Sequence, residues 1–401
     1  MKITFITFLV ATLPVCLVAQ DWTHYTEANG LISNDVVSLH IDQDDNVWVG
    51  TEDGLVRFDG EDWETYQCFP KMNSSTIESI EEDKFGRLWL GIGNFSSKLN
   101  TSFGLITMSE VTWNIYTRSQ SLKNVIPENF YIKDIAIDHQ NAAWMVSSNG
   151  QVLKYDGFQW LSLWLPNDPV FGFGITVDSH NDVWVGSSEG LTKISNMVLT
   201  TYTKADGLAG DEVLDIAEDR DGNIWISTLR GLSMYDGIRF TNYHMEDGLL
   251  SNQLTQLEFD SKGNLWIGSF KGVTKYNGKS FINYSFGNFN LIEEIKVDSD
   301  DNVWVIERGN GLFRLDADAP EPIPTEINSP DLFANIYPNP ATKSIEIDCK
   351  GFEKAAFYDL QGKLKWESTE QSVDVSSWKS GQYIVRIAAG DQVYYSKLIV
   401  E

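Results

Sequence analysis

An aspartate stands six residues before a tryptophan at seven places in the chain. The pairs are Asp42/Trp48, Asp83/Trp89, Asp138/Trp144, Asp178/Trp184, Asp219/Trp225, Asp260/Trp266 and Asp298/Trp304. A carboxylate in a regular pattern could act as a general acid or base, or as a metal ligand. Seven copies cannot all belong to one active site, and turn-forming Gly, Asn or Asp residues separate the partners. We therefore interpret each aspartate as an acceptor for backbone N–H groups in a hairpin turn.

The seven tryptophans allow two interpretations. Indole rings can stack on sugar faces, so a row of them could bind a carbohydrate. However, they occupy the same place on a short apolar strand in every repeat, which favours packing between repeats. We expect them to be structural.

Three of these turns also begin like a calcium-binding loop. They read D-x-D-x-N, at Asp42/Asp44/Asn46, Asp219/Asp221/Asn223 and Asp298/Asp300/Asn302. Alternate oxygens in such a turn can converge on Ca²⁺, but the glycine at loop position six and the distal bidentate glutamate are missing. We expect no metal site and no cofactor, and these turns leave calcium as the alternative.

The other reactive side chains form no catalytic pattern. The five histidines, His24, His40, His139, His180 and His244, are spread over different strands and turns. There is no nucleophile elbow, no phosphate-binding glycine loop and no HExxH pair. The three cysteines are too few for a disulfide framework. We therefore predict no catalytic residues.

The elements that must position these residues are short strands, which recur with the aspartate and tryptophan. Successive tryptophans are 38 to 55 residues apart, most of them about 41. A period near 40 with four strands per unit is typical of propeller blades. The first unit reads Val36–Ile41, Val47–Gly50, Gly54–Phe58 and Trp63–Tyr66. Seven units predict an all-β, seven-bladed β-propeller.

The outermost strand of each unit is displaced along the sequence. A copy of it, Trp22–Tyr25, precedes the first Asp/Trp pair, and no copy follows the last unit near Leu315. Because a closed ring leaves no exposed sheet edge, we expect Trp22–Tyr25 to complete the last blade.

Ligand contacts are expected where the loops before the first strand and between the second and third strands of each blade meet. The candidates are Arg230, Lys271, Arg308, Phe95, Phe171, Phe173, Phe270 and Phe289. Exposed arginine and aromatic side chains dominate recognition surfaces, although such residues also pack loops together. Arg230 and Lys271 occupy the same place on adjacent blades, and we expect that pair to favour an anionic group.

The net charge and the terminal segments of the chain indicate its partners and its cellular location. The 401 residues carry a formal net charge of −27, which disfavours nucleic acid and anionic membranes as partners. Residues 1–19 read as a signal peptide, and no other segment could span a membrane. We expect the propeller at residues 20–316, a Pro-rich linker at 317–333 and a small β-sandwich at 334–401.

The repeat D-x-x-G-N-x-W-[IV]-G-[ST]-x-x-G-[LV] resembles the two-component-regulator propeller repeat, which occurs in periplasmic sensors and in secreted proteins. The kinase and transmembrane segment of those sensors have no counterpart here, so direct signalling is not implied. Streptogramin-lyase-like enzymes use a similar seven-bladed ring. Their catalysis needs histidine and glutamate grouped on one face, and no such group can be assembled from this sequence.

Residues 334–401 resemble the C-terminal sorting domain of type IX secretion. The matching positions include Tyr337, Pro338, Asn339, Pro340, Gly362, Gly381 and Tyr383. The resemblance implies export through the periplasm, by the type IX machinery, to the surface of a Gram-negative bacterium or beyond it. We therefore expect an exported, non-enzymatic binding module for a glycan or a protein. The alternative is a lyase or glycosidase of the streptogramin-lyase-like type, with its site at the channel mouth.

Overall fold

The computed structural model describes residues 22–66, 76–93, 104–109, 112–117, 131–166, 170–284, 291–319, 335–358, 364–389 and 392–401. The chain divides into two compact units, of which Asp21–Ala319 is one and Pro320–Glu401 belongs to the other. The predicted signal peptide, residues 320–333 of the predicted linker, and the residues Phe95, Phe289 and Gly362 lie outside the described residues. Within the described parts, no helix is long and apolar enough to cross a membrane.

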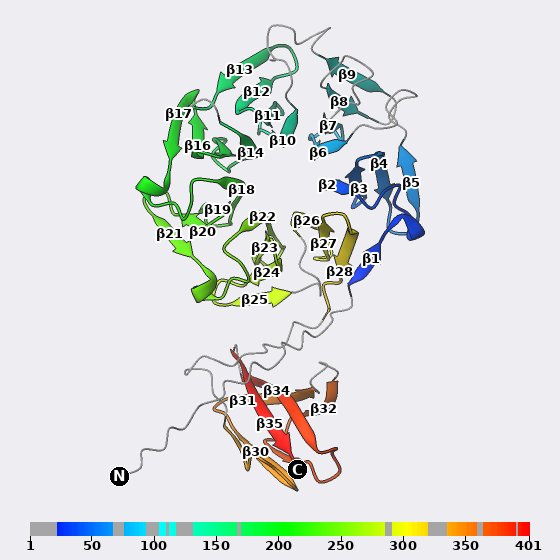
Figure 1. Cartoon of the computed structure of the whole chain (residues 1–401), viewed down its shortest axis with the longest axis vertical. Helices are drawn as coiled ribbons and strands as arrows, with labels where there is room; N and C mark the ends of the chain where they lie inside the picture. Colours follow the sequence, from blue (N-terminus) through cyan, green and yellow to red (C-terminus); the bar gives the residue numbers. More distant parts are fainter. Residues whose placement is uncertain are drawn as a thin grey trace, which may run out of the picture. The chain divides into compact units, whose positions relative to one another are not determined.

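Seven four-stranded antiparallel sheets make up the first unit. Figure 1 shows them as the blades of a ring, with the first strand of each blade at the centre. The inner strands are β2 (Val36–Ile41), β6 (Ile77–Glu82), β10 (Ile132–Ile137), β14 (Gly172–Val177), β18 (Val213–Glu218), β22 (Leu254–Phe259) and β26 (Ile292–Val297). The second strands, which carry the tryptophans, are β3 (Val47–Thr51), β7 (Leu88–Ile92), β11 (Ala143–Ser147), β15 (Val183–Ser187), β19 (Ile224–Thr228), β23 (Leu265–Ser269) and β27 (Val303–Glu307).

The outer half of each blade repeats in the same way. The third strands are β4 (Gly54–Phe58), β8 (Gly104–Met108), β12 (Gln151–Tyr155), β16 (Gly190–Ser195), β20 (Gly231–Tyr235), β24 (Gly272–Tyr276) and β28 (Gly311–Leu315). The outermost strands are β5 (Trp63–Tyr66), β9 (Trp113–Thr117), β13 (Trp160–Trp164), β17 (Val198–Tyr202), β21 (Phe240–Tyr243), β25 (Phe281–Tyr284) and β1 (Thr23–Tyr25). Strand β1 pairs antiparallel with β28, with Tyr25 opposite Leu312, so the first strand of the chain completes the seventh blade.

The core lies between neighbouring blades. All seven repeated tryptophans are at most 6% exposed. Trp304 of the last blade packs with Val36 and Val49 of the first, and Trp89 of the second blade packs with Ile132 of the third. Each tryptophan therefore buries a large apolar area against the next blade, which stabilises the ring by holding its blades together.

The same packing recurs at other interfaces around the ring. Trp184 of the fourth blade lies in one buried cluster with Ile216 of the fifth, and Trp266 of the sixth blade lies in another with Ile295 of the seventh. In each case the tryptophan comes from a second strand and its partner from the next inner strand. All four of these interfaces between blades are thus built from the same two kinds of strand.

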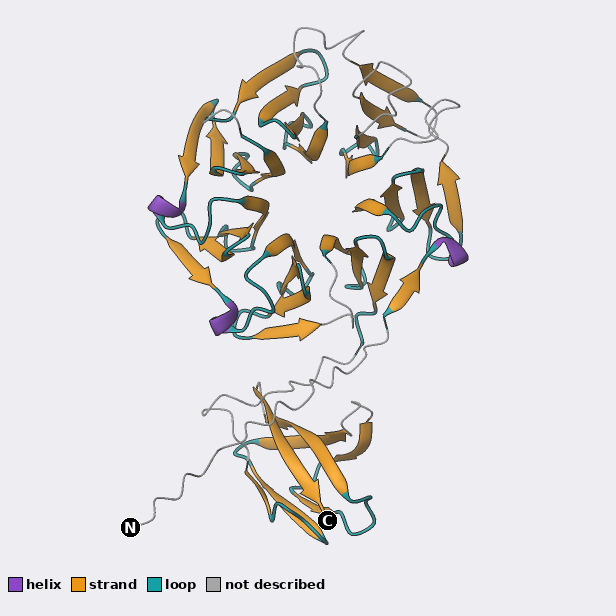
Figure 2. Cartoon of the chain, viewed as in Figure 1, coloured by secondary structure: helices purple, strands orange, loops and turns teal. Residues whose placement is uncertain are grey.

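Short 3-10 helices connect three blades to the next at the outer rim (Figure 2). They are η1 (Glu27–Asn29), η3 (Lys204–Asp206) and η4 (Met245–Asp247). Each ends at a glycine with positive φ, for example Gly207 at 117°, a backbone conformation that side chains disfavour. A side chain on Gly30 would also overlap the Trp63 ring, so glycine is required there by space as well as by conformation.

The second unit is a small all-β domain. One sheet has the order β29 (Asn335–Tyr337), β30 (Ser344–Asp348) and β33 (Ser372–Asp374). The other has the order β32 (Leu364–Ser368), β31 (Phe352–Tyr358), β34 (Gly381–Ala389) and β35 (Gln392–Val400). Alternate residues of both sheets, among them Ile345, Phe357 and Val385, form one buried core.

Candidate functional site

The centre of the ring holds a cavity of about 800 Å³ that the inner strands line. It extends to the loops before the inner strands, at Asp35 and Tyr131, and to the loops between second and third strands, at Phe270 and Arg308. We call this end of the cavity the mouth. Since ligand sites in ring folds occupy such concavities, the cavity is the candidate functional site.

The backbone of the inner strands explains why polar side chains reach this cavity. In every inner strand the pairing with its neighbour is shifted near the start, for example between Ile132 and Asp134 of β10. Such a bulge bends the strand and turns the following side chains. The third or fifth residue of several inner strands then supplies a charged group to the cavity wall. Examples are Asp134, Glu81 and Lys296.

Three carboxylates of the wall link one blade to the next. Asp134 accepts a hydrogen bond from the backbone N–H of Ile175 in the following blade (2.9 Å). Asp215 accepts one from Leu257 (2.8 Å), and Glu294 accepts one from Leu39 across the closure of the ring (2.8 Å). These carboxylates therefore have a structural role in joining inner strands, whatever else they do.

Burial shifts the protonation of these groups. Loss of hydration raises the pKa of Asp134 to about 7 and that of Asp215 to about 6, although backbone N–H groups and Lys296 oppose the rise. Burial likewise raises the pKa of Glu294 and of Glu258, against the attraction of Lys296. A wall of this kind holds part of its carboxyl groups protonated near neutral pH.

Among the described residues, the wall contains ten carboxylates and three cationic side chains, Lys133, Lys296 and Arg308. Lys296 Nζ lies 3.7 Å from Glu258 Oε2 and 3.8 Å from Glu294 Oε1. Lys133 pairs with Glu78 at 3.1 Å, and Arg308 pairs with Glu293 at 3.2 Å. Each cation is thus already engaged by a carboxylate, and the cavity is strongly acidic.

The predicted ligand residues fall into two groups. Arg308, Phe173 and Phe270 line the cavity, and the Phe270 side chain is 39% exposed. Arg230, Lys271 and Phe171 are exposed on nearby loops and are not part of the cavity wall.

The repeated tryptophans take no part in the candidate site. Trp184 is only 2% exposed and Trp266 only 4%, and neither lines the cavity. The other five, Trp48, Trp89, Trp144, Trp225 and Trp304, are equally buried and equally absent from the wall. No sugar face could stack on rings that the adjacent blade already covers, so these seven residues are core residues and not ligand contacts.

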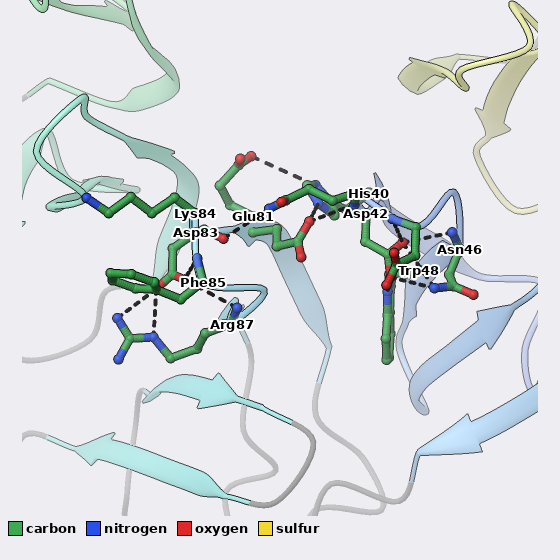
Figure 3. Close-up of polar contacts among 12 residues, drawn as sticks. His40, Asp42, Asn46, Trp48, Glu81, Asp83, Lys84, Phe85 and Arg87 are labelled. Carbon is green, nitrogen blue, oxygen red and sulfur yellow. Dashed lines mark hydrogen bonds and ion pairs between the residues drawn. The ribbon is translucent and has the colours of Figure 1, made fainter.

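The repeated aspartates are engaged in their own turns. In all seven blades Oδ1 accepts the backbone N–H groups two and four residues later, and Oδ2 accepts the indole Nε1–H of the tryptophan at 2.7–3.1 Å. Figure 3 shows two of these groups, Asp42 with Asn46 and Trp48, and Asp83 with Arg87. Burial alone would raise the pKa of Asp83, but hydrogen bonds from Trp89 and Phe85 and the Arg87 charge outweigh it, so that pKa is lowered.

Two of the described histidines lie 4.0 Å from carboxylates, His244 beside Asp247 at the outer rim and His40 on an inner strand. His40 Nδ1 is 4.0 Å from Glu81 Oε2, and its Nε2 is 4.0 Å from Glu82 Oε2 (Figure 3). His40 is 8% exposed and does not line the cavity, although Glu81 does. The pair therefore does not present an acid and a base together to a substrate at the mouth. Over the residues that are described, no group of three or more His, Cys, Asp or Glu side chains has an arrangement that could hold a metal ion.

The carboxylates and lysines of the inner strands were not among the predicted site residues. A signal for them exists, because charged residues interrupt strands that are otherwise apolar, as at Lys133-Asp134 and at Glu293, Glu294 and Lys296. These side chains meet in one cavity wall because of the bulges and the closure of the ring, and the sequence pattern reveals neither.

The fold and its central cavity define a seven-bladed β-propeller protein with a second, smaller β unit. The family described as "Two component regulator propeller" matches residues 30–53, 207–230 and 248–271. The family described as "Secretion system C-terminal sorting domain" matches residues 335–401. The chain therefore carries two-component-regulator propeller repeats and a type IX secretion sorting domain, and the sorting domain implies export to the Gram-negative cell surface or the medium. The comparison with curated proteins finds no match.

Solved structures share the fold at low sequence identity. The extracellular domain of a putative hybrid two component system from B. thetaiotaomicron has a TM-score of 0.62 at 16% identity, over 95% of this chain and 57% of that one. The chain thus spans little more than half of that domain. PorZ, an essential bacterial surface component of the type-IX secretion system of Porphyromonas gingivalis, has a TM-score of 0.51 at 14% identity, over 92% and 66%. Virginiamycin B lyase from Staphylococcus aureus has a TM-score of 0.60 at 12% identity, over 74% and 98%.

Proposed function

We propose that the propeller is a non-enzymatic binding module, which the sorting domain delivers to the cell exterior and which binds a glycan or a protein at the mouth of its central cavity. The observation that carries the proposal is the cavity itself, with its volume of about 800 Å³ and its mixed polar and aromatic lining. Concave sites with a few convergent polar groups are the usual place for ligands in a rigid ring.

Three side chains at the mouth would make the first contacts. Phe173 and Phe270 offer aromatic faces, and Arg308 offers a charged head that is 69% exposed although it pairs with Glu293. Aromatic and arginine side chains contribute most to binding energy at interfaces. A macromolecular ligand that overlies the mouth would also contact Phe171, Arg230 and Lys271 on the surrounding loops.

A lyase or glycosidase activity remains the other candidate class, but no arrangement among the described residues favours it. The two histidines beside carboxylates, His40 and His244, are off the cavity wall. Asp134 and Asp215 are each held by two backbone N–H groups. The likeness to virginiamycin B lyase extends to the fold alone.

The proposal is tested with the full exported chain on an array of peptides and of neutral and acidic oligosaccharides. We expect at least one class of probe to bind, and Phe270→Ala to weaken that binding about ten-fold or more, since an aromatic anchor contributes at least that much. Phe158→Ala is the matched control, because Phe158 is 96% exposed on a turn that is not part of the cavity wall. Binding that responds equally to both substitutions, or no binding of any probe, would refute the proposal.

A further inference from the structure

The carboxylates in one part of the cavity wall are paired with lysine or arginine side chains, and those in another part are not. Lys296 lies among Glu258 and Glu294, Lys133 beside Glu78, and Arg308 beside Glu293. In the first and second blades, the wall carries Asp35, Glu52 and Glu81. Among the residues that the structure describes, no lysine or arginine forms an ion pair within 4.0 Å with any of these three. Glu81 lies 4.0 Å from His40, and the charge of Lys296 acts on it only from beyond ion-pair distance.

This unpaired sector lies on the route from the mouth into the cavity. Asp35 precedes β2 and Glu52 follows β3, and the backbone N–H of Glu52 donates to the carbonyl of Asp35 (3.1 Å), so both residues sit on one pair of mouth loops. Glu81 is the fifth residue of β6, deeper on the neighbouring inner strand, and its side chain is 31% exposed. A ligand group that enters beside the first blade therefore meets one carboxylate after another.

A further feature of the wall suits the same kind of ligand. Phe173 and Phe270 present aromatic rings, whose faces attract cations as carboxylates do. Aromatic rings, carboxylates and the net charge of −27 all favour a positively charged ligand.

We propose that the cavity receives a cationic group, the side chain of a lysine or arginine carried by a protein segment, and binds it against Glu81 with Asp35 and Glu52 at the entrance. This inference rests on the proposed function and specifies its ligand. Charge-assisted hydrogen bonds to carboxylates are the strongest available contacts for such a group. Protonated amines at neutral pH are common in proteins, whereas most sugar groups are neutral or anionic, so a protein is favoured over a glycan. The pair Arg230 and Lys271, from which we expected an anionic ligand, lies outside this wall.

The test measures binding of the full chain to a short peptide with one central lysine, to its arginine counterpart, and to the same peptide with the lysine side chain acetylated. We expect the two charged peptides to bind, and acetylation to weaken binding at least ten-fold, since it removes the charge and its hydrogen bonds. Glu81→Gln should weaken binding of the lysine peptide by a similar factor. Glu61→Gln, which removes one exposed carboxylate that is not part of the wall, should leave it unchanged.

The outcomes separate this inference from the proposed function. If a uronic-acid oligosaccharide binds and its binding depends on Phe270, the binding module stands and the cationic ligand is overturned. If the acetylated peptide binds as well as the charged one, or if Glu61→Gln acts like Glu81→Gln, general attraction to an acidic protein explains the data and the inference fails. If none of these probes binds, the cationic ligand is likewise rejected, and the array decides on the binding module.

Discussion

The repeated aspartate acts through its turn and its tryptophan. Each carboxylate accepts two backbone N–H groups and the indole N–H, so it fixes the hairpin and the orientation of the ring that fills the space between blades. In six blades a cation also covers that ring, as Lys154 covers Trp144 with its Nζ 4.6 Å from the ring centroid. In five of them the cation comes from the third strand, and in the second blade it is Arg87 of the turn itself. In the fifth blade Met234 holds the corresponding position opposite Trp225. Residue type and spacing were sufficient to predict that the aspartate accepts backbone N–H groups in its own turn, because these partners lie within four residues. The bond to the indole was not predicted.

Removal of one aspartate should destabilise its blade. Asp42→Ala leaves the N–H groups of Asp44, Asn46 and Trp48 without their acceptor, and we expect a loss of about 2 kcal/mol in the free energy of unfolding. Asp44→Ala in the same turn removes an exposed carboxylate and should cost much less. Denaturant unfolding of both variants measures the difference, and equal stabilities would contradict the assigned role.

The buried carboxylates predict a dependence of stability on pH. Burial raises the pKa of Glu294 from 4.5 to about 8. The folded state therefore holds more protons than the unfolded state between about pH 4.5 and 8, and stability falls as the pH rises through this interval. Glu294→Gln keeps an acceptor for the Leu39 N–H but does not titrate. We expect thermal melts at a series of pH values to fall less steeply for Glu294→Gln than for the parent chain. If the melting temperatures of the two chains change with pH in parallel, Glu294 does not contribute to the pH dependence of stability.

At the scale of elements, the ring is closed by a strand from the start of the chain. In β1, His24 stacks on Phe313 with ring centroids 4.1 Å apart, and Tyr25 packs against Phe58, Trp63 and Trp304. This closure could be predicted because the outer strand occurs once before the first repeat and is missing after the last. The bulges of the inner strands could not be predicted in the same way, because no residue type marks them consistently.

Loss of the Tyr25 ring should weaken this closure. The ring contacts side chains of both the first and the last blade, so Tyr25→Ala is expected to lower the free energy of unfolding by about 2–3 kcal/mol. Thr23→Ala in the same strand removes an exposed side chain and serves as control. If both variants melt at the same temperature, β1 does not hold the ring together.

At the scale of the whole molecule, an exported unit and a sorting unit share one chain. Within the sorting domain, Asn339 Nδ2 donates to the carbonyl of Lys397 (2.6 Å), and its Oδ1 accepts the N–H of Ile399 (2.8 Å), so the Y-P-N-P segment holds the last strand in place. Both the domain and its destination could be predicted because these residues resemble the type IX sorting domain. The ligand could not be predicted, because the cavity exists only when inner strands from all seven blades meet.

Deletion of residues 335–401 should stop export. The chain without its sorting domain is expected to accumulate in the periplasm, because the matched domain is the part that directs type IX secretion. Fractionation of cells with an antibody against the propeller measures this, with an unrelated type IX cargo as control. If the truncated chain still reached the cell surface, the sorting role of the domain would be disproved.

The central claim, that the ligand enters the cavity, is tested most directly by filling that cavity. Thr176 lines the cavity wall on β14, and Thr200 is exposed on the outer strand β17 of the same blade. The measurement is the affinity of the full chain for whichever array probe it binds, in Thr176→Trp and in Thr200→Trp, after both are shown to melt like the parent chain. The account predicts that Thr176→Trp loses binding at least ten-fold and that Thr200→Trp does not. Undiminished binding by Thr176→Trp would place the ligand elsewhere on the molecule and contradict the account.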